Sequence, residues 1–149
     1  MAELKIRRLK ESDLEEVMTI ERNAFAKPWQ KRVFLKELNN EYAYYLVGVY
    51  QQEIAAYIGA WFLADRCHIT NLATAKSYRR LGFAGKLIEY LCDKSKNLEI
   101  KRLTLEVRSS NQKAQTLYKK HGFIKLGIKK NYYSNNNEDA VLMYKRVER

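Results

Sequence analysis

Hydrophobic residues along this chain switch repeatedly between the alternation typical of strands and the wider spacing typical of helices. Because the order of such segments limits which elements can lie side by side, it constrains the fold more than any other feature. The order is strand, two helices, three strands, helix, strand, helix and two strands. It favours one mixed α/β domain over residues 1–149, with a mostly antiparallel central sheet flanked by helices. The expected segments are 4–9, 13–24, 28–39, 44–50, 54–63, 66–74, a helix that includes 84–92, 102–107, a helix that includes 114–121, 124–128 and 140–144.

Three local signals predict where helices begin and end. Ser12, followed three residues later by Glu15, predicts a capping box at the first helix. Pro28 predicts the start of the second helix, because proline is favoured in a first turn. Gly122 predicts the end of the last helix, where a left-handed residue commonly closes the final turn.

The remaining bulk properties indicate an ordinary soluble globular protein. Hydrophobic residues make up 46% of the 149 and charged residues 30%, which excludes a disordered chain. No apolar run reaches the ~18–20 residues of a membrane helix. The N-terminus lacks the apolar block of a signal peptide, so we expect a cytoplasmic protein with no membrane partner.

Cysteines and histidines show no metal-binding spacing. Cys67 and Cys92 each sit in an apolar segment, and we expect buried free thiols rather than a disulfide. His68 and His121 have no neighbouring ligand pattern, so no metal site is predicted.

The formal net charge of +11 is the unusual bulk property. It is compatible with an anionic ligand, with ribosomal RNA or with another nucleic-acid surface. The lysines and arginines are nevertheless scattered along the chain, as on a solvated basic surface. We therefore expect no stable nucleic-acid partner, while a weak contact with RNA or the ribosome stays open.

The stretch from Ser77 to Cys92 places two arginines and two glycines at the start of an apolar helix. The first turn of a helix leaves backbone N–H groups without partners, and the helix dipole adds positive charge there. Small residues at 82, 84 and 85 let an anion approach the backbone, and Arg79 and Arg80 add charge. A phosphate-binding turn and a merely tight, well-packed loop both fit this pattern.

Further segments narrow the choice. Arg79-x-x-Gly82-x-Ala84 matches the pyrophosphate-binding motif Arg/Gln-x-x-Gly-x-Gly/Ala of the GNAT acetyltransferases, and the order of elements is similar. The chain resembles their RimI-type branch, which acetylates the N-terminal alanine of a small-subunit ribosomal protein. It departs from that branch at 73–76, Ala-Thr-Ala-Lys, where Val, then Asp or His, then Pro is usual. The matching segments are 20–29, 71–73, 105–111, 117–118, 122–123, 131–133 and 138–140.

The resemblance implies acetyl-CoA as cosubstrate, with no metal. Leu72, Ala73 and Thr74 would offer backbone groups to the pantetheine arm and the thioester carbonyl. Asn111 would contact CoA, and it is also a plausible N-cap of its helix. The pyrophosphate would lie on the loop formed by Arg79, Arg80, Leu81, Gly82, Phe83, Ala84 and Gly85.

Two residues would carry the chemistry by the same resemblance. Strand alternation directs Glu106 to one face together with Thr104 and Arg108. Glu106 matches the general base, the alternative being an exposed carboxylate paired with Arg108. Tyr118 matches the general acid that protonates the leaving CoA sulfur, the alternative being a buried structural tyrosine. Neither cysteine matches a catalytic position, so direct attack by the amine is expected.

The implied substrate is a ribosomal protein N-terminus. An α-amine titrates near ~7.7–8.0 and a lysine near ~10.4, so a single carboxylate base suits the α-amine better. Acetylation of a lysine or a small amine remains an alternative, as does a non-catalytic module that binds RNA or the ribosome. Core packing is a competing role for Trp29. The residues that match the peptide groove are Glu21, Trp29, Tyr132, Tyr133 and Asp139.

Overall fold

The computed structural model describes residues 3–147, so the outermost residues of the predicted domain, 1–2 and 148–149, lie outside the described range. Its elements follow one another in the predicted order. Two short 3-10 turns, Glu11–Asp13 and Lys76–Tyr78, precede α1 and α3. The elements are β1 (Lys5–Arg8), α1 (Leu14–Ala24), α2 (Lys31–Leu38), β2 (Ala43–Tyr50), β3 (Glu53–Leu63), β4 (Arg66–Thr74), α3 (Phe83–Asn97), β5 (Arg102–Arg108), α4 (Gln112–Lys120), β6 (Ile124–Tyr133) and β7 (Glu138–Arg146).

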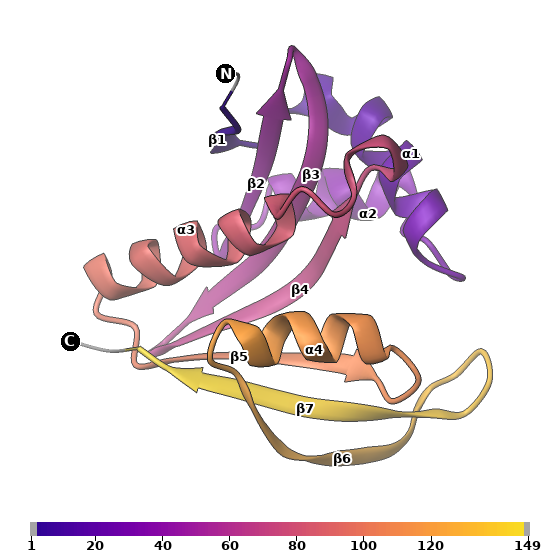
Figure 1. Cartoon of the computed structure of the whole chain (residues 1–149), viewed down its shortest axis with the longest axis vertical. Coiled ribbons are helices and arrows are strands. Elements are labelled where there is room, and N and C mark those ends of the chain that lie inside the picture. Colours follow the sequence, from indigo (N-terminus) through magenta and orange to yellow (C-terminus); the bar gives the residue numbers. More distant parts are fainter. Residues whose placement is uncertain (1–2, 148–149) are drawn as a thin grey trace.

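One seven-stranded sheet runs through the molecule in the order β1-β2-β3-β4-β5-β7-β6 (Figure 1). Every neighbouring pair is antiparallel except β4 and β5, which are parallel and joined through α3. The expectation of a mixed α/β domain with a mostly antiparallel sheet is therefore confirmed.

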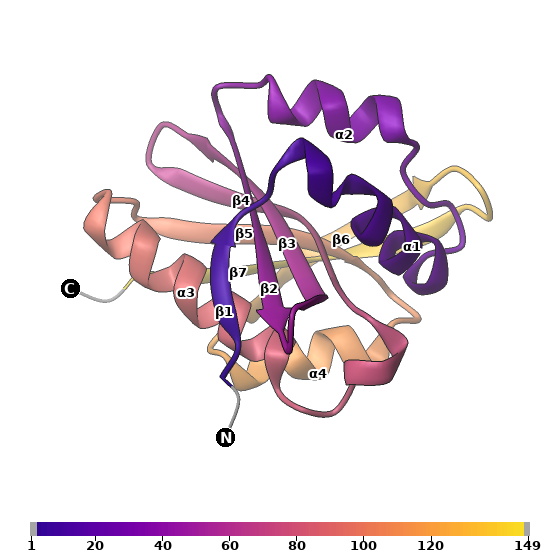
Figure 2. The same ribbon diagram turned by 90° about the horizontal axis from the view of Figure 1, so that it is seen from above.

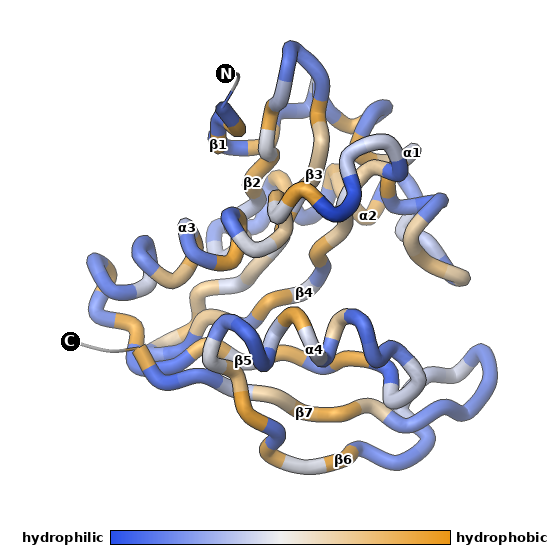
Figure 3. Tube along the Cα trace, viewed as in Figure 1, coloured by the Kyte–Doolittle hydropathy of each residue, from blue (hydrophilic) through white to orange (hydrophobic). Residues whose placement is uncertain are grey.

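Helices cover both faces of this sheet, α1 and α2 on one side and α3 and α4 on the other (Figure 2). Adjacent residues of one strand pack against the helices on opposite faces of the sheet. In β2, Leu46 packs with the α3 and α4 residues while Val47 packs with α1 and α2, and Ile58 and Tyr57 of β3 divide in the same way. Central strands buried on both faces need apolar residues at successive positions, which explains the apolar runs of β2 and β3 (Figure 3).

The parallel pair β4 and β5 separates part-way along its length. Pairing runs from Arg66 with Arg102 to Ile69 with Leu105, and no described strand continues it on that side. Beyond this point β4 stays bonded to β3 as far as Thr74, while β5 stays bonded to β7 as far as Arg108. Figure 1 shows the two strands diverging below α1. The sheet therefore opens into two halves at its centre.

Two of the predicted helix signals are wrong. The capping box is formed two residues earlier than expected, at Lys10 and Asp13, because the carboxylate of Asp13 accepts the Lys10 N–H at 2.8 Å and is held by the Arg7 guanidinium at 2.7 Å. Ser12 and Glu15 do not form it. Helix α2 begins at Lys31, since the extended residues after Pro28 bring the Trp29 N–H to the Glu21 carboxylate.

The C-terminal strands are longer than their apolar cores suggested. β6 continues to Tyr133 and β7 starts at Glu138, so the connecting turn is 134–137. The hairpin is irregular between Lys125 and Gly127 and again between Lys129 and Tyr133. These irregularities hide the alternation that identifies a strand.

Candidate active site

A cleft of about 450 Å³ lies where β4 and β5 separate. Its walls come from the end of α1 and the following loop, from the middle of β4 and the end of β5, from the start of α4, and from the β6–β7 turn. Eight of the residues predicted to form the site line it: Glu21, Trp29, Leu72, Glu106, Asn111, Tyr118, Tyr132 and Tyr133.

Glu106 projects from β5 with both carboxylate oxygens occupied. Its side chain is 13% exposed, and Oε2 accepts a hydrogen bond from the Lys129 ammonium at 3.0 Å. The other oxygen, Oε1, lies 3.2 Å from Nε2 of His68. Arg108 is not the partner of Glu106, as the structural alternative had expected, because its guanidinium pairs with Glu138 at 3.2 Å instead.

These neighbours keep Glu106 ionised. Burial acts to raise the pKa of Glu106, but hydrogen bonds from Lys129 and Tyr132 and the charge of Lys129 outweigh it and leave the pKa below its ordinary value. The carboxylate is thus unprotonated at neutral pH and can accept a proton.

His68 is a neutral neighbour rather than a second cation. Burial lowers the pKa of His68, and the nearby Glu106 carboxylate opposes this effect only in part. Its Nδ1 lies 2.8 Å from the Thr104 hydroxyl. A ring that carries its proton on Nε2 explains both contacts, since Nε2–H then faces Glu106 and Nδ1 accepts from Thr104.

Tyr118 reaches the cleft from α4. The residue is 7% exposed, and its ring packs edge-on against Phe123 at 5.5 Å between centroids. Burial strongly raises the pKa of Tyr118, and the proximity of Tyr133 adds to the effect. The phenol is therefore protonated at neutral pH, as a proton donor must be. Tyr118 is thus a buried, packed tyrosine, as the structural alternative expected, and its position in the cleft is also compatible with the predicted role as general acid.

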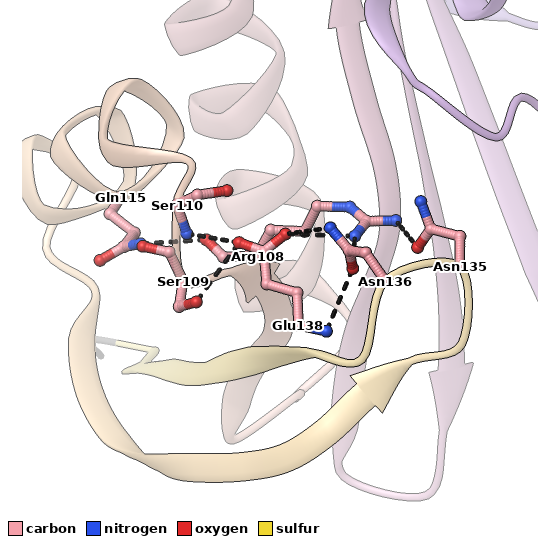
Figure 4. A network of polar contacts seen from close by, with 7 residues as sticks. All are labelled: Arg108, Ser109, Ser110, Gln115, Asn135, Asn136 and Glu138. Carbon is pink, nitrogen blue, oxygen red and sulfur yellow. Dashed lines mark hydrogen bonds and ion pairs between the residues drawn. The ribbon is translucent and has the colours of Figure 1, made fainter.

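The turn from β5 into α4 is fixed by a polar network (Figure 4). The Glu138 carboxylate accepts the Ser110 N–H at 2.7 Å and pairs with Arg108. Hydrogen bonds from Ser110, followed by those from Arg108, lower the pKa of Glu138 to about 2. Asn111 then caps α4 by accepting the Ala114 N–H at 3.1 Å, as predicted. This network sets the direction of the helix that carries Tyr118.

The same network reaches the β6–β7 hairpin. Arg108 donates to Asn135 at 2.9 Å, and its guanidinium lies 4.0 Å from the centre of the Tyr133 ring. Tyr132 and Tyr133 meet edge-on at 5.0 Å. Asp139 does not line the cleft; its carboxylate accepts the Asn131 N–H at 2.9 Å at an irregular part of the hairpin. Asp139 therefore shapes the strand that carries the two tyrosines.

Glu21 is buried at the opposite wall. It is 2% exposed, accepts the Trp29 N–H at 2.9 Å and receives the Tyr57 hydroxyl. Asn71 donates to Tyr57 at 3.2 Å and accepts from Thr70 at 2.8 Å, which extends the chain of polar contacts into β4.

The core packing considered for Trp29 is present, and the residue also lies where a role in the peptide groove would place it. Its ring packs edge-on against Phe34 at 5.3 Å, and it also lines the cleft. The hydrogen bond from the Trp29 N–H to the Glu21 carboxylate fixes the loop that carries this ring.

The glycine loop lies beyond the cleft, at the start of α3. Besides Asp139, the predicted residues outside the cleft lining are Ala73, Thr74 and the whole of 79–85. Gly82 is left-handed with φ 80° and is the N-cap of α3, and no side chain caps the helix there. The first N–H groups of α3 therefore remain available to an external acceptor.

The small and apolar residues of this loop occupy their positions for different physical reasons. A Cβ added to Gly82 would meet nothing within 4 Å, so its left-handed backbone is what requires glycine. A Cβ on Gly85 would lie 2.6 Å from Nε2 of His121, so a larger residue there would force the His121 ring or α3 to move. The Phe83 ring is buried against Tyr50 at 5.0 Å and anchors the start of the helix. Arg79 donates to the Thr74 carbonyl at 3.4 Å.

His68 and Lys129 were missed by the reasoning from sequence. In the parallel register His68 lies opposite Thr104, which is two positions before Glu106 on β5. The pairing of β4 with β5 could therefore have suggested that His68 lies near Glu106. Lys129 reaches Glu106 from β6, which does not neighbour β5 in the sheet. No sequence pattern indicated that contact.

Two further findings concern possible ligands and membranes. Within residues 3–147, no group of three or more His, Cys, Asp or Glu side chains is arranged to hold a metal ion. No helix of this described part is both long and apolar enough to cross a membrane.

Comparison with known proteins gives the family. Residues 14–123 match the model of the acetyltransferase (GNAT) family, which is most of the chain. The chain belongs to the GNAT acetyltransferase family. It is accordingly an N-acetyltransferase, and this GNAT family uses acetyl-CoA as acetyl donor.

Two relatives resemble the chain over nearly its whole length. A Bacillus subtilis protein, provisionally named ribosomal protein bS18-alanine N-acetyltransferase, is 41% identical over 140 residues, 93% of each chain. The Escherichia coli K12 protein of that name is 31% identical over 137 residues, 91% of this chain and 92% of the relative.

Solved structures agree with the fold. The Escherichia coli ribosomal-protein-S18-alanine N-acetyltransferase superposes with a TM-score of 0.90 at 30% identity, covering 99% of this chain and 96% of the other. Arabidopsis thaliana NAA60, solved with acetyl-CoA, has a TM-score of 0.89 at 19% identity, covering 97% of this chain and 99% of the other. The latter likeness concerns the fold alone.

Proposed function

We propose that this protein transfers the acetyl group of acetyl-CoA to the α-amine of an N-terminal alanine, and that ribosomal protein bS18 is its substrate. The observation that carries the proposal is the placement of an ionised Glu106 and a protonated Tyr118 in one cleft at the opening of the sheet. The names and the near-complete coverage of the relatives support the choice of alanine and of bS18.

In this mechanism the amine nitrogen attacks the thioester carbonyl carbon directly. Glu106 receives the proton of the substrate ammonium, through a bound water or by contact, so that the nitrogen has a free electron pair. A C–N bond forms, the C–S bond breaks, and Tyr118 gives its proton to the departing sulfur. Of the two protons left on nitrogen, one passes to solvent as the amide forms and the other stays as the amide N–H, while solvent takes the proton held by Glu106 and reprotonates Tyr118.

The cosubstrate would be bound by backbone more than by side chains. Leu72, Ala73 and Thr74 lie on the part of β4 that β5 has left, where the outer strand edge is free to bond an extended chain such as the pantetheine arm. The start of α3 from Gly82 to Gly85 would receive the pyrophosphate, with Arg79 and Arg80 beside it. Asn111 would contact CoA from the start of α4.

The walls of the cleft also fit an extended peptide. Glu21 and Trp29 stand on one side, and Tyr132 and Tyr133 stand on the other. Peptide bonds and side chains that enter between aromatic rings bury apolar surface while keeping polar groups near solvent. Asp139 would contribute indirectly, through the shape of β6.

A peptide pair tests the proposal. Both peptides begin with alanine, continue as bS18 does and carry the same internal lysine; the N-terminus is free in the first and blocked in the second. Release of CoA from acetyl-CoA with the first peptide alone is the expected result. Equal release with both would move the activity to lysines, and release with neither would contradict the proposed function.

A further inference from the structure

Lys129 forms a close ion pair with Glu106, and the proposed mechanism gives this ion pair no role. Its ammonium, on a side chain that is 50% exposed, lies 3.0 Å from Oε2 of Glu106, the carboxylate that would receive the proton of the amine. A cation beside a carboxylate makes that carboxylate a weaker proton acceptor. A strong general base would be better served without it, so the ion pair needs another explanation.

The charge balance around Glu106 supplies one. Of the groups that face it, His68 on β4 is neutral, and Tyr132 and Tyr133 on β6 are neutral phenols. Arg66, at the start of β4, acts on His68 and Lys129 without pairing with Glu106. Within the described residues, Lys129 is the cation that pairs with Glu106, so the two together carry no net charge.

Without Lys129, the Glu106 carboxylate would hold the substrate ammonium as an ion pair. Such a pair favours the charged form of the amine and raises its pKa, and the charged form cannot attack a carbonyl. Binding energy would then stabilise the unreactive ground state. With Lys129 in place the carboxylate is already paired, and an arriving ammonium gains much less by keeping its proton.

We propose that Lys129 is a positioning residue that acts through Glu106: its ammonium neutralises the carboxylate, so that the substrate α-amine is held as the neutral nucleophile. This inference rests on the proposed function, because it assumes that Glu106 faces the reacting amine. It adds a residue of β6 that sets which protonation state of the amine the site binds.

The test is the pH dependence of kcat and KM for Lys129→Met with the alanine peptide, since kcat reports groups in the enzyme–substrate complex. The rising limb of kcat should move to higher pH by about one unit or more. At pH values below the amine pKa, kcat falls about tenfold or more, and the two enzymes converge at high pH. KM for the peptide should not rise, because a lone carboxylate binds the ammonium at least as well.

Matched variants separate this role from a structural one. Lys129→Arg keeps the charge and should restore the wild-type pH profile. Lys130→Met removes the neighbouring exposed lysine, which makes no ion pair with the described residues, and should leave the profile unchanged.

A kcat for Lys129→Met that is lowered equally at every pH, or unchanged at every pH, would overturn the inference. Peptide binding in the presence of CoA, which needs no turnover, should strengthen in Lys129→Met at neutral pH. Unchanged or weaker binding there would also contradict it. An inactive wild-type enzyme would instead show that the proposed function is wrong, before any variant is compared.

Discussion

At the scale of single residues, the proposed chemistry requires one acid and one base to hold opposite protonation states at the same pH. Glu106 is kept ionised by Lys129 and Tyr132, although burial alone would have favoured its neutral form. Tyr118 is kept neutral by burial. Environment thus assigns the two roles, and neither residue needs a pKa close to neutrality to begin the reaction in the correct form.

Removing either group should reduce turnover without preventing binding. Glu106→Gln cannot accept the proton of the ammonium, and Tyr118→Phe cannot protonate the leaving sulfur. We expect kcat to fall about 10²-fold or more in each variant, with KM for acetyl-CoA nearly unchanged. Steady-state kinetics with saturating peptide measures both quantities.

A control shows whether such a loss is local. Glu41→Gln changes an exposed carboxylate outside the cleft and should leave kcat unaltered. Wild-type kcat in both Glu106→Gln and Tyr118→Phe would mean that the mechanism is wrong, whatever the substrate.

At the scale of elements, the start of α3 depends on its contact with α4. Gly85→Ala would place a methyl group 2.6 Å from the His121 ring, so either α3 or the ring must move. Overpacking of this kind costs about 1–3 kcal/mol of the free energy of unfolding. Because the shift would fall on the first turn of α3, KM for acetyl-CoA should also rise.

Chemical denaturation and acetyl-CoA titration check both effects. The double variant Gly85→Ala/His121→Ala should regain the stability lost through the clash, apart from the cost of His121→Ala itself. Gly127→Ala is a matched control, since a Cβ there would meet nothing within 4 Å. If Gly85→Ala were as stable as Gly127→Ala, the packing explanation would fail.

Strand β5 shows what an element's own sequence can and cannot reveal. Alternation correctly assigned Leu103, Leu105 and Val107 to the buried face and Glu106 to the other. It could not reveal the partner of Glu106. That partner depends on how the irregular hairpin of β6 and β7 folds back over β5, and this irregularity leaves no periodic signal.

At the scale of the whole molecule, the order of elements was predictable because each depends on local spacing of apolar residues. The sheet order was not, since β7 lies between β5 and β6 only through long-range pairing. Helix ends were less predictable for the same reason: Asp13 caps the first helical turn because Arg7, on β1, holds its carboxylate.

The candidate site likewise contains residues that the sequence indicates and residues that only the folded sheet brings together. Residues that match a family motif, such as Glu106 and Tyr118, could be proposed from sequence because the resemblance supplied their roles. His68 and Lys129 belong to no motif and meet Glu106 only after β4, β5, β7 and β6 have assembled. The separation of β4 from β5, which creates the cleft, is likewise a property of the complete sheet.

The site of acetylation on intact, unmodified bS18, after incubation with the enzyme and acetyl-CoA, distinguishes transfer to the N-terminal alanine from every alternative substrate group. Mass spectrometry of the digested product identifies the modified group. We expect one acetyl group, on the α-amine of the N-terminal alanine. Acetylation confined to lysine side chains, or an unmodified protein under conditions where the enzyme binds acetyl-CoA, would contradict it.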